Sequence, residues 1–220
     1  MGNLNQFDFV KENVQLIKGP VLEVGSKDYG NTPNFRALLP EAQYLGVDLE
    51  PGKGVDLVRD LTDDLRTITS GLPVPSFNTV ICFSVLEHCR HPFKMCDNLS
   101  ALLNRGGVVF VSVPFSWRIH AYPSDYWRFT PEGVKVLFPG FDFEAHPGHV
   151  STSIDGERDS LNDSMMRVEM SVKRARERKR CGLGAALTVH VIKKLGILPH
   201  VFRYRHLFPP VMVNMIGVKR

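Results

Sequence analysis

The sequence predicts an α/β fold in which a mainly parallel sheet is covered by helices on both faces. Short apolar runs rich in β-branched residues end at a glycine or an aspartate, and apolar patterns of helical period lie between them. Parallel strands are buried on both faces and need long, usually helical, crossovers, so the two patterns belong together. With 220 residues, 43% of them hydrophobic and 23% charged, the chain suits one such domain with extra elements. Intrinsic disorder, a collagen-like chain and a disulfide scaffold are excluded.

Apolar runs give the expected strands in chain order. They cover residues 20–25, 44–48, 55–58, 77–83 and 108–113. Between the last two, four apolar residues recur at helical spacing over Pro92–Asn104, with proline at the start and glycines after the end. A further strand is expected over residues 211–218, and residues 141–150 are compatible with another.

The segment before the last strand, residues 151–208, is predicted to be a helical insertion in a domain formed by residues 1–150 and 209–220. An apolar stripe at helical spacing leads there into the basic run Lys173–Arg180. The stripe consists of Leu161, Met165, Val168 and Val172. This pattern is typical of an amphipathic helix with a basic end.

Charge is divided unevenly along the chain. Residues 1–166 hold 14 basic and 21 acidic residues, a net charge of −7, whereas residues 167–220 hold 13 basic and 2 acidic residues, a net charge of +11. Such asymmetry indicates a binding partner or a charged surface to which the chain binds.

Three interpretations of the basic insertion stay open. The first is a solvated helix that packs on the domain or on a second copy in a homodimer. The second is peripheral membrane contact, where each Lys or Arg near anionic lipid contributes about 1 kcal/mol. Nucleic-acid binding ranks last, because few aromatic residues accompany the arginines.

Cysteine usage and the apolar stretches indicate a cytoplasmic protein. The four cysteines form no C-x-x-C pair and match no metal-ligand spacing, so neither a disulfide framework nor a metal site is predicted. They are Cys82, Cys89, Cys96 and Cys181. The first residues lack a signal-peptide pattern, and Gly182–Leu198 is too short and too charged to span a bilayer.

Candidate ligand-binding residues follow the first expected strand, at the edge where open parallel sheets bind ligands. They are Glu23, Gly25, Ser26 and Gly30. A glycine lets the backbone approach a ligand closely, and the N-terminus of a following helix would favour an anionic group. Lys27 fills the second glycine position of the G-x-G-x-x-G fingerprint, so the sequence weighs against a nicotinamide-dependent dehydrogenase.

Acidic residues follow the second and third expected strands. Asp48 can accept hydrogen bonds from two ribose hydroxyls and lies at about the 20-residue distance expected of a nucleoside-binding acid. Asp60 can meet the exocyclic amine of adenine. The alternatives are structural: Asp48 as a turn acid before Pro51, and Asp60 as the N-cap of a helix beginning at Leu61. Together the acids predict an adenosine pocket without a phosphate clamp.

Five motifs, taken in order, resemble the class I S-adenosylmethionine-dependent methyltransferases, and most closely a type-11-like branch with an L-E-H element. They are V-L-E-V-G at 21–25, L-G-V-D at 45–48, D-L at 60–61, S-V-L-E-H at 84–88 and L-N-R-G-G at 103–107. Their order and spacing carry the resemblance, which spans about Phe7 to Val150 and the final strand. It implies a Rossmann-like, mostly parallel sheet of seven strands.

The resemblance also implies S-adenosyl-L-methionine as the cofactor. In that family the glycine turn cradles the methionine part, the acid after the second strand holds the ribose, and the acid after the third meets adenine. Carried over by motif, the cofactor-binding residues are Glu23, Gly25, Ser26, Gly30, Asp48, Leu49, Asp60, Leu61, Ser84 and His88. Residues 26–29 depart from the family's E-x-G-x-G-x-G pattern, of which only the first glycine aligns.

A dense cluster of aromatic, basic and acidic residues, Pro114–Thr130, follows the fifth strand, where the family places its acceptor site. Similar H-x-x-P-x-D-Y-x-R-F-T segments recur in this branch. His120 is predicted as the general base, and Asp125 as its orienting partner or as an alternative base. The predicted substrate-binding residues are Trp117, Tyr122, Tyr126 and Arg128. In the alternative, Asp125 and Arg128 pair to pin the loop and His120 is a solvated loop residue. The weaker candidates for the base are His88, His91 and His149.

The chemistry suits such a site. Methyl transfer from a sulfonium is an in-line displacement that mainly needs alignment, worth up to ~7–11 kcal/mol. An oxygen nucleophile gains a further ~10²–10⁴-fold from a general base. The predicted function is S-adenosylmethionine-dependent methyl transfer to a small or medium-sized acceptor, at oxygen. The alternative is a non-catalytic adenosine-nucleotide-binding scaffold that docks through its basic insertion.

Overall fold

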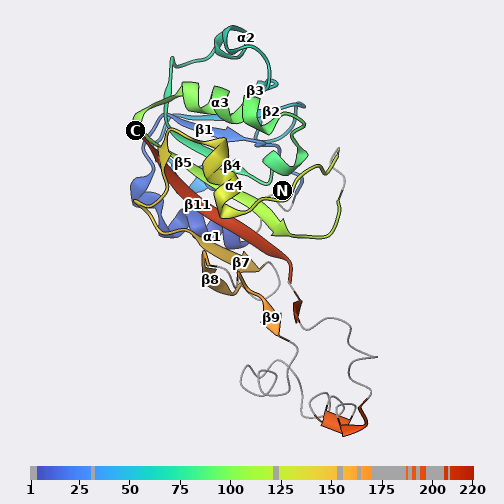
Figure 1. The fold of residues 1–220 in the computed structure, drawn as a ribbon. Coiled ribbons are helices and arrows are strands. Elements are labelled where there is room, and N and C mark those ends of the chain that lie inside the picture. The colour runs from blue at the N-terminus through green and yellow to red at the C-terminus, as the bar shows by residue number, and fades with distance from the viewer. Residues whose placement is uncertain are drawn as a thin grey trace. The chain divides into compact units, whose positions relative to one another are not determined.

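A computed structural model of the chain describes residues 4–30, 33–120, 124–152, 156–162, 165–169, 187, 190–191, 194–196, 206–207 and 209–220. The chain divides into two compact units, Met1–Met165 with Pro210–Arg220, and Met166–Pro209. The first unit holds the large sheet labelled in Figure 1. In the second unit, β9 (Val168–Glu169) pairs antiparallel with β10 (His206–Leu207).

The sheet of the first unit has the order β3-β2-β1-β4-β5-β11-β7-β8, with β6 paired to β11. Its strands are β1 (Val21–Val24), β2 (Tyr44–Asp48), β3 (Leu57–Val58), β4 (Phe77–Phe83), β5 (Leu103–Ser116), β6 (Phe141–Asp142), β7 (His149–Thr152), β8 (Arg158–Ser160) and β11 (Val211–Lys219). From β3 to β5 every pairing is parallel, whereas β11 runs antiparallel to β5, β6 and β7. The α/β class and its parallel core are confirmed.

The strand count differs from the expected seven, because the described residues form nine strands in this sheet. One addition is β8, whose sequence Arg-Asp-Ser carries no apolar run and lies at the sheet's antiparallel edge. The other arises because the expected strand over residues 141–150 is split into the short strands β6 and β7. The sheet therefore continues past residue 150, where the insertion is predicted to begin.

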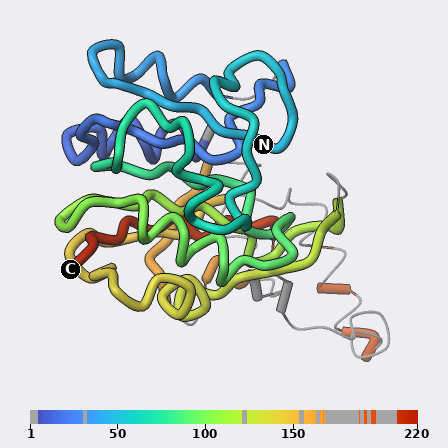
Figure 2. The backbone as a smooth tube through the Cα atoms, turned by 90° about the horizontal axis from the view of Figure 1, so that it is seen from above, coloured from blue at the N-terminus to red at the C-terminus, as the bar shows by residue number. Residues whose placement is uncertain are grey.

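Helices cover both faces of the sheet. The α-helices are α1 (Leu4–Glu12), α2 (Leu65–Thr69), α3 (Pro92–Leu102) and α4 (Pro131–Leu137), and the 3₁₀ helices are η1 (Val14–Leu16), η2 (Phe35–Leu38) and η3 (Leu86–His88). On one face, Phe9 of α1 packs edge-on against Phe110, with ring centroids 5.9 Å apart. Phe35 of η2 meets Phe83 in the same way at 5.3 Å. Figure 2 shows α1 and α4 on opposite sides of β11.

The prediction of a helix directly after the glycine turn of β1 is wrong. Among the described residues between β1 and β2, only the one-turn η2 is helical, and it begins at Phe35 after the capping residue Asn34. The helix expected at Leu61 begins instead at Leu65. A helix N-terminus therefore does not contribute its dipole at either strand end.

The amphipathic helix expected over residues 161–172 is also wrong for the part of it that the structure describes. Met165 and Met166 are buried and have φ values of +33° and +64°. The amide of Met165 donates to both the backbone carbonyl and the side-chain oxygen of Asn162, at 3.2 Å each. Asparagine competes with helical hydrogen bonds in this way, so a turn replaces the helix. The basic run Lys173–Arg180 lies outside the described residues.

Two further features bear on the sequence predictions. No helix in the described part of the chain is both long and apolar enough to cross a membrane. Cys82, Cys89 and Cys96 are buried and unpaired, and burial raises the pKa of each thiol. These thiols therefore pack as small apolar groups, and Cys181 lies outside the described residues.

Candidate active site

The turn after β1 is shaped by Gly25. Its φ of +73° lies in the left-handed region, and a Cβ built there would lie 2.5 Å from Cγ2 of Val85. The amides of Gly25 and Ser26 both donate to the carbonyl of Val47 on β2, at 2.8 and 3.2 Å. Only glycine fits this position, and the close approach brings the ends of β1, β2 and β4 together. Gly30 also has a positive φ, +91°, but open space around its Cβ position.

Asp48 ends β2 with both carboxylate oxygens facing backbone amides. Oδ2 accepts a hydrogen bond from the amide of Lys27 at 3.1 Å, and Oδ1 accepts one from the amide of Glu50 at 3.2 Å. The side chains of Lys27 and Glu50 pair with each other at 2.7 Å, and within the described residues the carboxylate of Asp48 forms no ion pair of its own. Each oxygen keeps a lone pair, so Asp48 can accept from a diol.

The residues after β3 separate into an exposed acid and a buried apolar side chain. Oδ1 of Asp60 accepts from the amide and the hydroxyl of Thr62, at 2.8 and 2.7 Å, which closes a turn. Leu61 is 3% exposed and belongs to the core. Leu49, after Asp48, is 59% exposed and offers an apolar surface at the end of β2. We call Gly25, Asp48, Leu49 and Asp60 the strand-end cluster.

Two buried polar side chains come from β1 and its turn. Ser26 is 6% exposed, and its hydroxyl has no hydrogen-bond partner within the described ranges. Oη of Tyr44 donates to Glu23 at 2.8 Å, and burial raises the pKa of Glu23 to about 7. A buried hydroxyl without a partner is the kind of group that a bound ligand satisfies.

The turn after β4 is held by a buried polar network that the sequence did not reveal. Ser84 has a φ of +53°. Its hydroxyl accepts from Nε2 of Gln6 on α1 at 3.0 Å, and the same nitrogen lies 2.8 Å from Oγ of Ser112. Ser112 donates in turn to Asn214 of β11 at 2.8 Å. Gln6, Ser112 and Asn214 are fully buried, so these bonds stabilise an otherwise unfavourable backbone conformation.

Backbone hydrogen bonds tie the loop after β5 to η3. The amides of Tyr126 and Trp127 both donate to the carbonyl of Glu87, at 2.8 and 3.3 Å. The indole Nε1 of Trp127 donates to the carbonyl of Cys89 at 2.8 Å. The loop is thereby fixed beside the L-E-H turn.

Asp125 is the buried anchor of this loop. Its side chain is 3% exposed and receives a bidentate pair of hydrogen bonds from Arg128, one of them at 2.7 Å. It also accepts from the amide of His120 at 2.9 Å, and its Oδ2 lies 3.2 Å from Nδ1 of the His120 ring. Because the Arg128 guanidinium holds the pKa of Asp125 well below its usual range, Asp125 is a weak base and a strong orienting partner.

Arg128 also stabilises this loop by donating hydrogen bonds to its backbone. Besides Asp125, it donates to the carbonyls of Trp117 and Arg118, at 3.3 and 3.1 Å through Nη2. The structural pairing of Asp125 with Arg128, which the sequence left open, is therefore present. It coexists with an oriented His120, since one carboxylate serves both partners.

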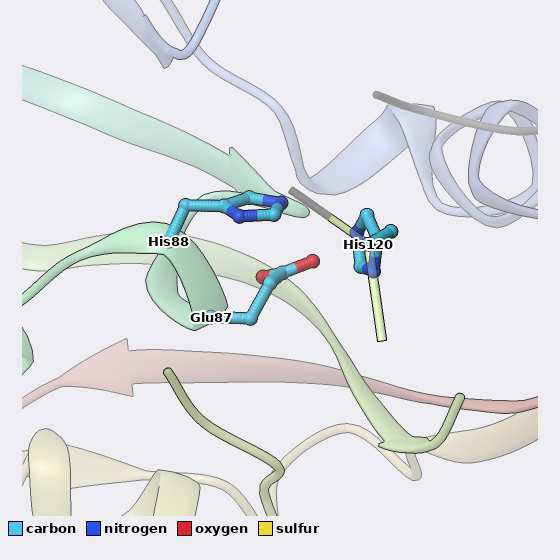
Figure 3. A group of neighbouring side chains, drawn as sticks. All are labelled: Glu87, His88 and His120. Carbon is cyan, nitrogen blue, oxygen red and sulfur yellow. The ribbon is translucent and has the colours of Figure 1, made fainter. Parts of the chain in front are cut away.

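Three titratable side chains meet between η3 and the loop. Glu87, His88 and His120 each offer a ligand atom, all within 4.8 Å of one another, and Figure 3 shows a carboxylate oxygen of Glu87 pointing between the two rings. The rings of His88 and His120 stand edge to face with centroids 4.8 Å apart. Glu87 is 1% exposed, and burial raises its pKa to about 7. We call Glu87, His88, His120 and Asp125 the loop cluster.

The remaining candidates are spread around these two clusters. Trp117 is partly buried, Tyr126 is 43% exposed with Arg90 over its ring, and Tyr122 lies outside the described residues. His91 is exposed at the start of α3. His149, a weaker candidate for the base, packs edge-on against Phe9 of α1, and burial lowers its pKa to about 4. Trp127, which is 41% exposed, is a further aromatic residue of this loop that the sequence did not single out.

A family model described as a methyltransferase domain matches residues 7–154. A comparison with curated proteins gives no match. Solved structures of low identity share the fold. A SAM-dependent methyltransferase from Archaeoglobus fulgidus is 15% identical, with a TM-score of 0.53 over 97% of this chain and 92% of that chain. A possible histamine N-methyltransferase from Thermotoga maritima is 15% identical, with a TM-score of 0.52 over 100% and 90%. The 1,6-didemethyltoxoflavin-N1-methyltransferase of Burkholderia thailandensis is 12% identical, with a TM-score of 0.51 over 98% and 77%.

The family match spans well over half of the chain and includes both clusters. The methyltransferase family and the cofactor predicted from the sequence are thereby confirmed, while the type-11-like branch with its L-E-H element and the roles of individual residues stay predictions. The chain belongs to the methyltransferase-domain family and is an S-adenosylmethionine-dependent methyltransferase.

Proposed function

We propose that this methyltransferase acts on a hydroxyl oxygen of a small or medium-sized acceptor. The observation that carries the proposal is the pairing of His120 with Asp125, whose carboxylate lies 3.2 Å from the imidazole Nδ1. A neutral amine attacks through its own lone pair, whereas a hydroxyl gains from a base that takes its proton. An oriented imidazole in the loop after β5 therefore supports oxygen, although N-methyltransferases occur among the structural neighbours.

The strand-end cluster fits the cofactor. Asp48 has a free lone pair on each oxygen for the ribose hydroxyls, and the glycine turn at Gly25 lets the backbone come close. Leu49 would cover the adenine ring, and Oδ2 of Asp60 would accept from its amine, because Thr62 bonds only to Oδ1. When bound, S-adenosylmethionine supplies an electrophilic methyl group whose thioether leaves without needing a proton.

The loop cluster would accept the proton that the acceptor hydroxyl loses. Nε2 of His120 takes the hydroxyl proton, while Asp125 keeps the opposite ring nitrogen protonated and stabilises the imidazolium. Arg128 keeps Asp125 ionised, so the carboxylate does not compete for that proton. The side chain of His120 is 24% exposed, which leaves it within reach of an acceptor.

Binding of the cofactor product tests the strand-end cluster. Isothermal titration with S-adenosylhomocysteine should show binding to the wild type and at least tenfold weaker binding to Asp48→Ala, because hydrogen bonds to a charged group contribute about 1.5–3 kcal/mol. Asp97→Ala, an exposed acid on α3, is the matched control and should bind like the wild type. Equal affinity of Asp48→Ala and the wild type would contradict the assigned role.

Turnover tests the acceptor atom. Panels of small alcohols and phenols and of small amines are compared by product release, for the wild type and His120→Ala. The substitution should lower kcat on hydroxyl acceptors by ~10²–10⁴-fold without changing the affinity for S-adenosylhomocysteine. Turnover of amines alone, unaffected by His120→Ala, would overturn oxygen as the acceptor atom. Cofactor binding with no turnover on either panel would favour the non-catalytic scaffold.

A further inference from the structure

Glu87 is buried without a partner for its charge. Its side chain lies on η3, is 1% exposed, and its Oε2 has no hydrogen-bond partner in the part of the chain that is described. The guanidinium of Arg128, whose charge acts on Glu87, is hydrogen-bonded to Asp125. A buried carboxylate is stable when it binds a proton or faces a cation. The oxygen of Glu87 that lies between the rings of His88 and His120 is therefore placed to meet a cation (Figure 3).

In each of the two histidine rings, Nδ1 faces hydrogen-bond acceptors. Nδ1 of His88 lies 2.7 Å from the carbonyl of Ser124, an acceptor, so this nitrogen carries the proton. Nδ1 of His120 faces only acceptors, the carboxylate of Asp125 and the carbonyl of Arg118, each at 3.2 Å. In both rings Nε2 is left with its lone pair.

The hydrogen bonds at Nδ1 of His88 and His120 are of the kind that metal-binding histidines form with their second ring nitrogen. A ligating imidazole commonly donates its second N–H to a carboxylate or a backbone carbonyl, which fixes the ring and its tautomer. Here His120 has Asp125 in that position and His88 has the carbonyl of Ser124.

We propose that Glu87, His88 and His120 bind one divalent transition-metal ion of the zinc type. Two imidazoles and one carboxylate form a donor set that suits such ions and leaves positions open for a substrate. Magnesium prefers oxygen ligands throughout. The ligand atoms lie within 4.8 Å of one another, and bonds of about 2.0–2.2 Å need them closer. Small rotations of these side chains would close the site.

The site stands between the turn after β4 and the loop after β5, where the acceptor is placed. An acceptor oxygen in the open position would lose its proton more readily, because bound metal lowers the pKa of a coordinated hydroxyl. This part of the inference rests on the proposed oxygen acceptor. With metal bound, His120 would serve as a ligand, and the coordinated hydroxyl, its pKa lowered by the metal, would give its proton to water instead of to His120.

Metal binding is tested directly on the chelator-treated, full-length protein by titration with Zn²⁺. One equivalent is expected to bind the wild type, and Glu87→Gln, His88→Ala and His120→Asn should each bind it at least about 100-fold more weakly, since even outer partners of ligands contribute 10–100-fold. His91→Ala removes an exposed histidine close in sequence and should bind Zn²⁺ like the wild type. Far-ultraviolet circular dichroism and thermal unfolding check that each variant is folded.

The outcomes separate the metal site from the proposed function. The metal site is overturned if the wild type takes up no stoichiometric Zn²⁺, or if Glu87→Gln and His120→Asn bind it as tightly as the wild type, because the ion then binds elsewhere. Hydroxyl turnover that persists after chelation and still falls in His120→Ala would leave oxygen methylation intact and also refute the metal's role. Stoichiometric Zn²⁺ uptake by the wild type that is lost in the ligand variants supports the site, whatever the acceptor panel shows.

Discussion

The strand-end cluster and the loop cluster hold their carboxylates in opposite environments. Asp48 and Asp60 are at least partly exposed, and their partners are amides and hydroxyls within a few residues or in the adjoining turn. Asp125 and Glu87 are almost fully buried, and the pKa of Asp125 is lowered while that of Glu87 is raised. A solvated carboxylate exchanges water for a ligand at little cost, whereas a buried one must be paired or neutral. The first cluster is suited to reversible binding and the second to fixed charges that act on a reaction.

Removing Arg128, the cation that pairs with Asp125 of the loop cluster, should give the largest effect. Arg128→Met leaves the Asp125 charge buried without its bidentate partner, and we expect the free energy of unfolding to fall by about 3 kcal/mol. Chemical denaturation with urea measures the loss. Arg118→Met is the control, because Arg118 contributes only its backbone carbonyl to Arg128, and it should cost under about 0.5 kcal/mol. Equal free energies of unfolding for the two variants would show that the pair of Arg128 with Asp125 stabilises the protein no more than an exposed arginine does.

At the strand-end cluster, the backbone conformation and close packing of Gly25, and not a charge, should determine the loss of stability. Gly25→Ala should cost about 2–3 kcal/mol, from the positive φ and from the 2.5 Å approach of its Cβ to Val85. Gly71 has nearly the same φ, +75°, with nothing within 4 Å of its Cβ position, so Gly71→Ala isolates the backbone contribution. Thermal unfolding of both variants should show the larger drop in Tm for Gly25→Ala. If the two drops are the same, the packing against Val85 is not what requires glycine.

Glu23 on β1, two residues before Gly25 of the strand-end cluster, gives a pH-dependent effect. Burial raises the pKa of Glu23 from its ordinary value of 4.5 to about 7 in the folded state, so the folded protein binds the proton more tightly. Its contribution is complete below about pH 4.5 and is lost as the pH rises through about 7. Glu23→Gln stays neutral and should be more stable than the wild type at pH 8 by about 2 kcal/mol, with little difference at pH 5.

Denaturation curves at pH 5, 6.5 and 8 follow this effect. Glu41→Gln, at an exposed position, should leave the pH dependence of the wild type unchanged. A Glu23→Gln curve that stays parallel to the wild type from pH 5 to pH 8 would refute the buried, proton-binding carboxyl.

Leu49 should give the smallest effect and the most selective one. Because the side chain is 59% exposed, Leu49→Ala should change the free energy of unfolding by less than about 0.5 kcal/mol. Loss of its apolar cover over the adenine should weaken S-adenosylhomocysteine binding about fivefold, or ~1 kcal/mol. Val136→Ala, an equally exposed apolar residue on α4, should change neither quantity. Unchanged affinity in Leu49→Ala would remove this residue from the binding surface.

The parallel half of the fold follows from the sequence because each strand is a local apolar run that ends at a small or acidic residue. The strand-end cluster is predictable for the same reason, since Gly25 and Asp48 directly follow strands β1 and β2 in the chain or end them. Where polar residues decide the structure, the pattern misleads. The spacing of Leu161, Met165 and Val168 is helical, yet the hydrogen bonds of Asn162 produce a turn.

The loop cluster depends on contacts that local patterns do not contain. The sequence offers an adjacent Glu87-His88 pair, and His120 stands in another segment. Their meeting depends on the amides of Tyr126 and Trp127 docking on the carbonyl of Glu87. The sequence therefore predicts the two histidines as separate candidates and gives no sign of the buried carboxylate between them.

The polar network around Ser84 has a consequence for how the protein is made. Gln6 precedes Ser84 by 78 residues, and Asn214 follows Ser112 by 102 residues. Since synthesis runs from the N-terminus, the partner on α1 is available early and the partner on β11 very late. A nascent chain can complete β1 to β5 and still lack the support that fixes the turn after β4. Catalytic competence should therefore arise only after β11 has joined the sheet, so that incomplete chains do not methylate.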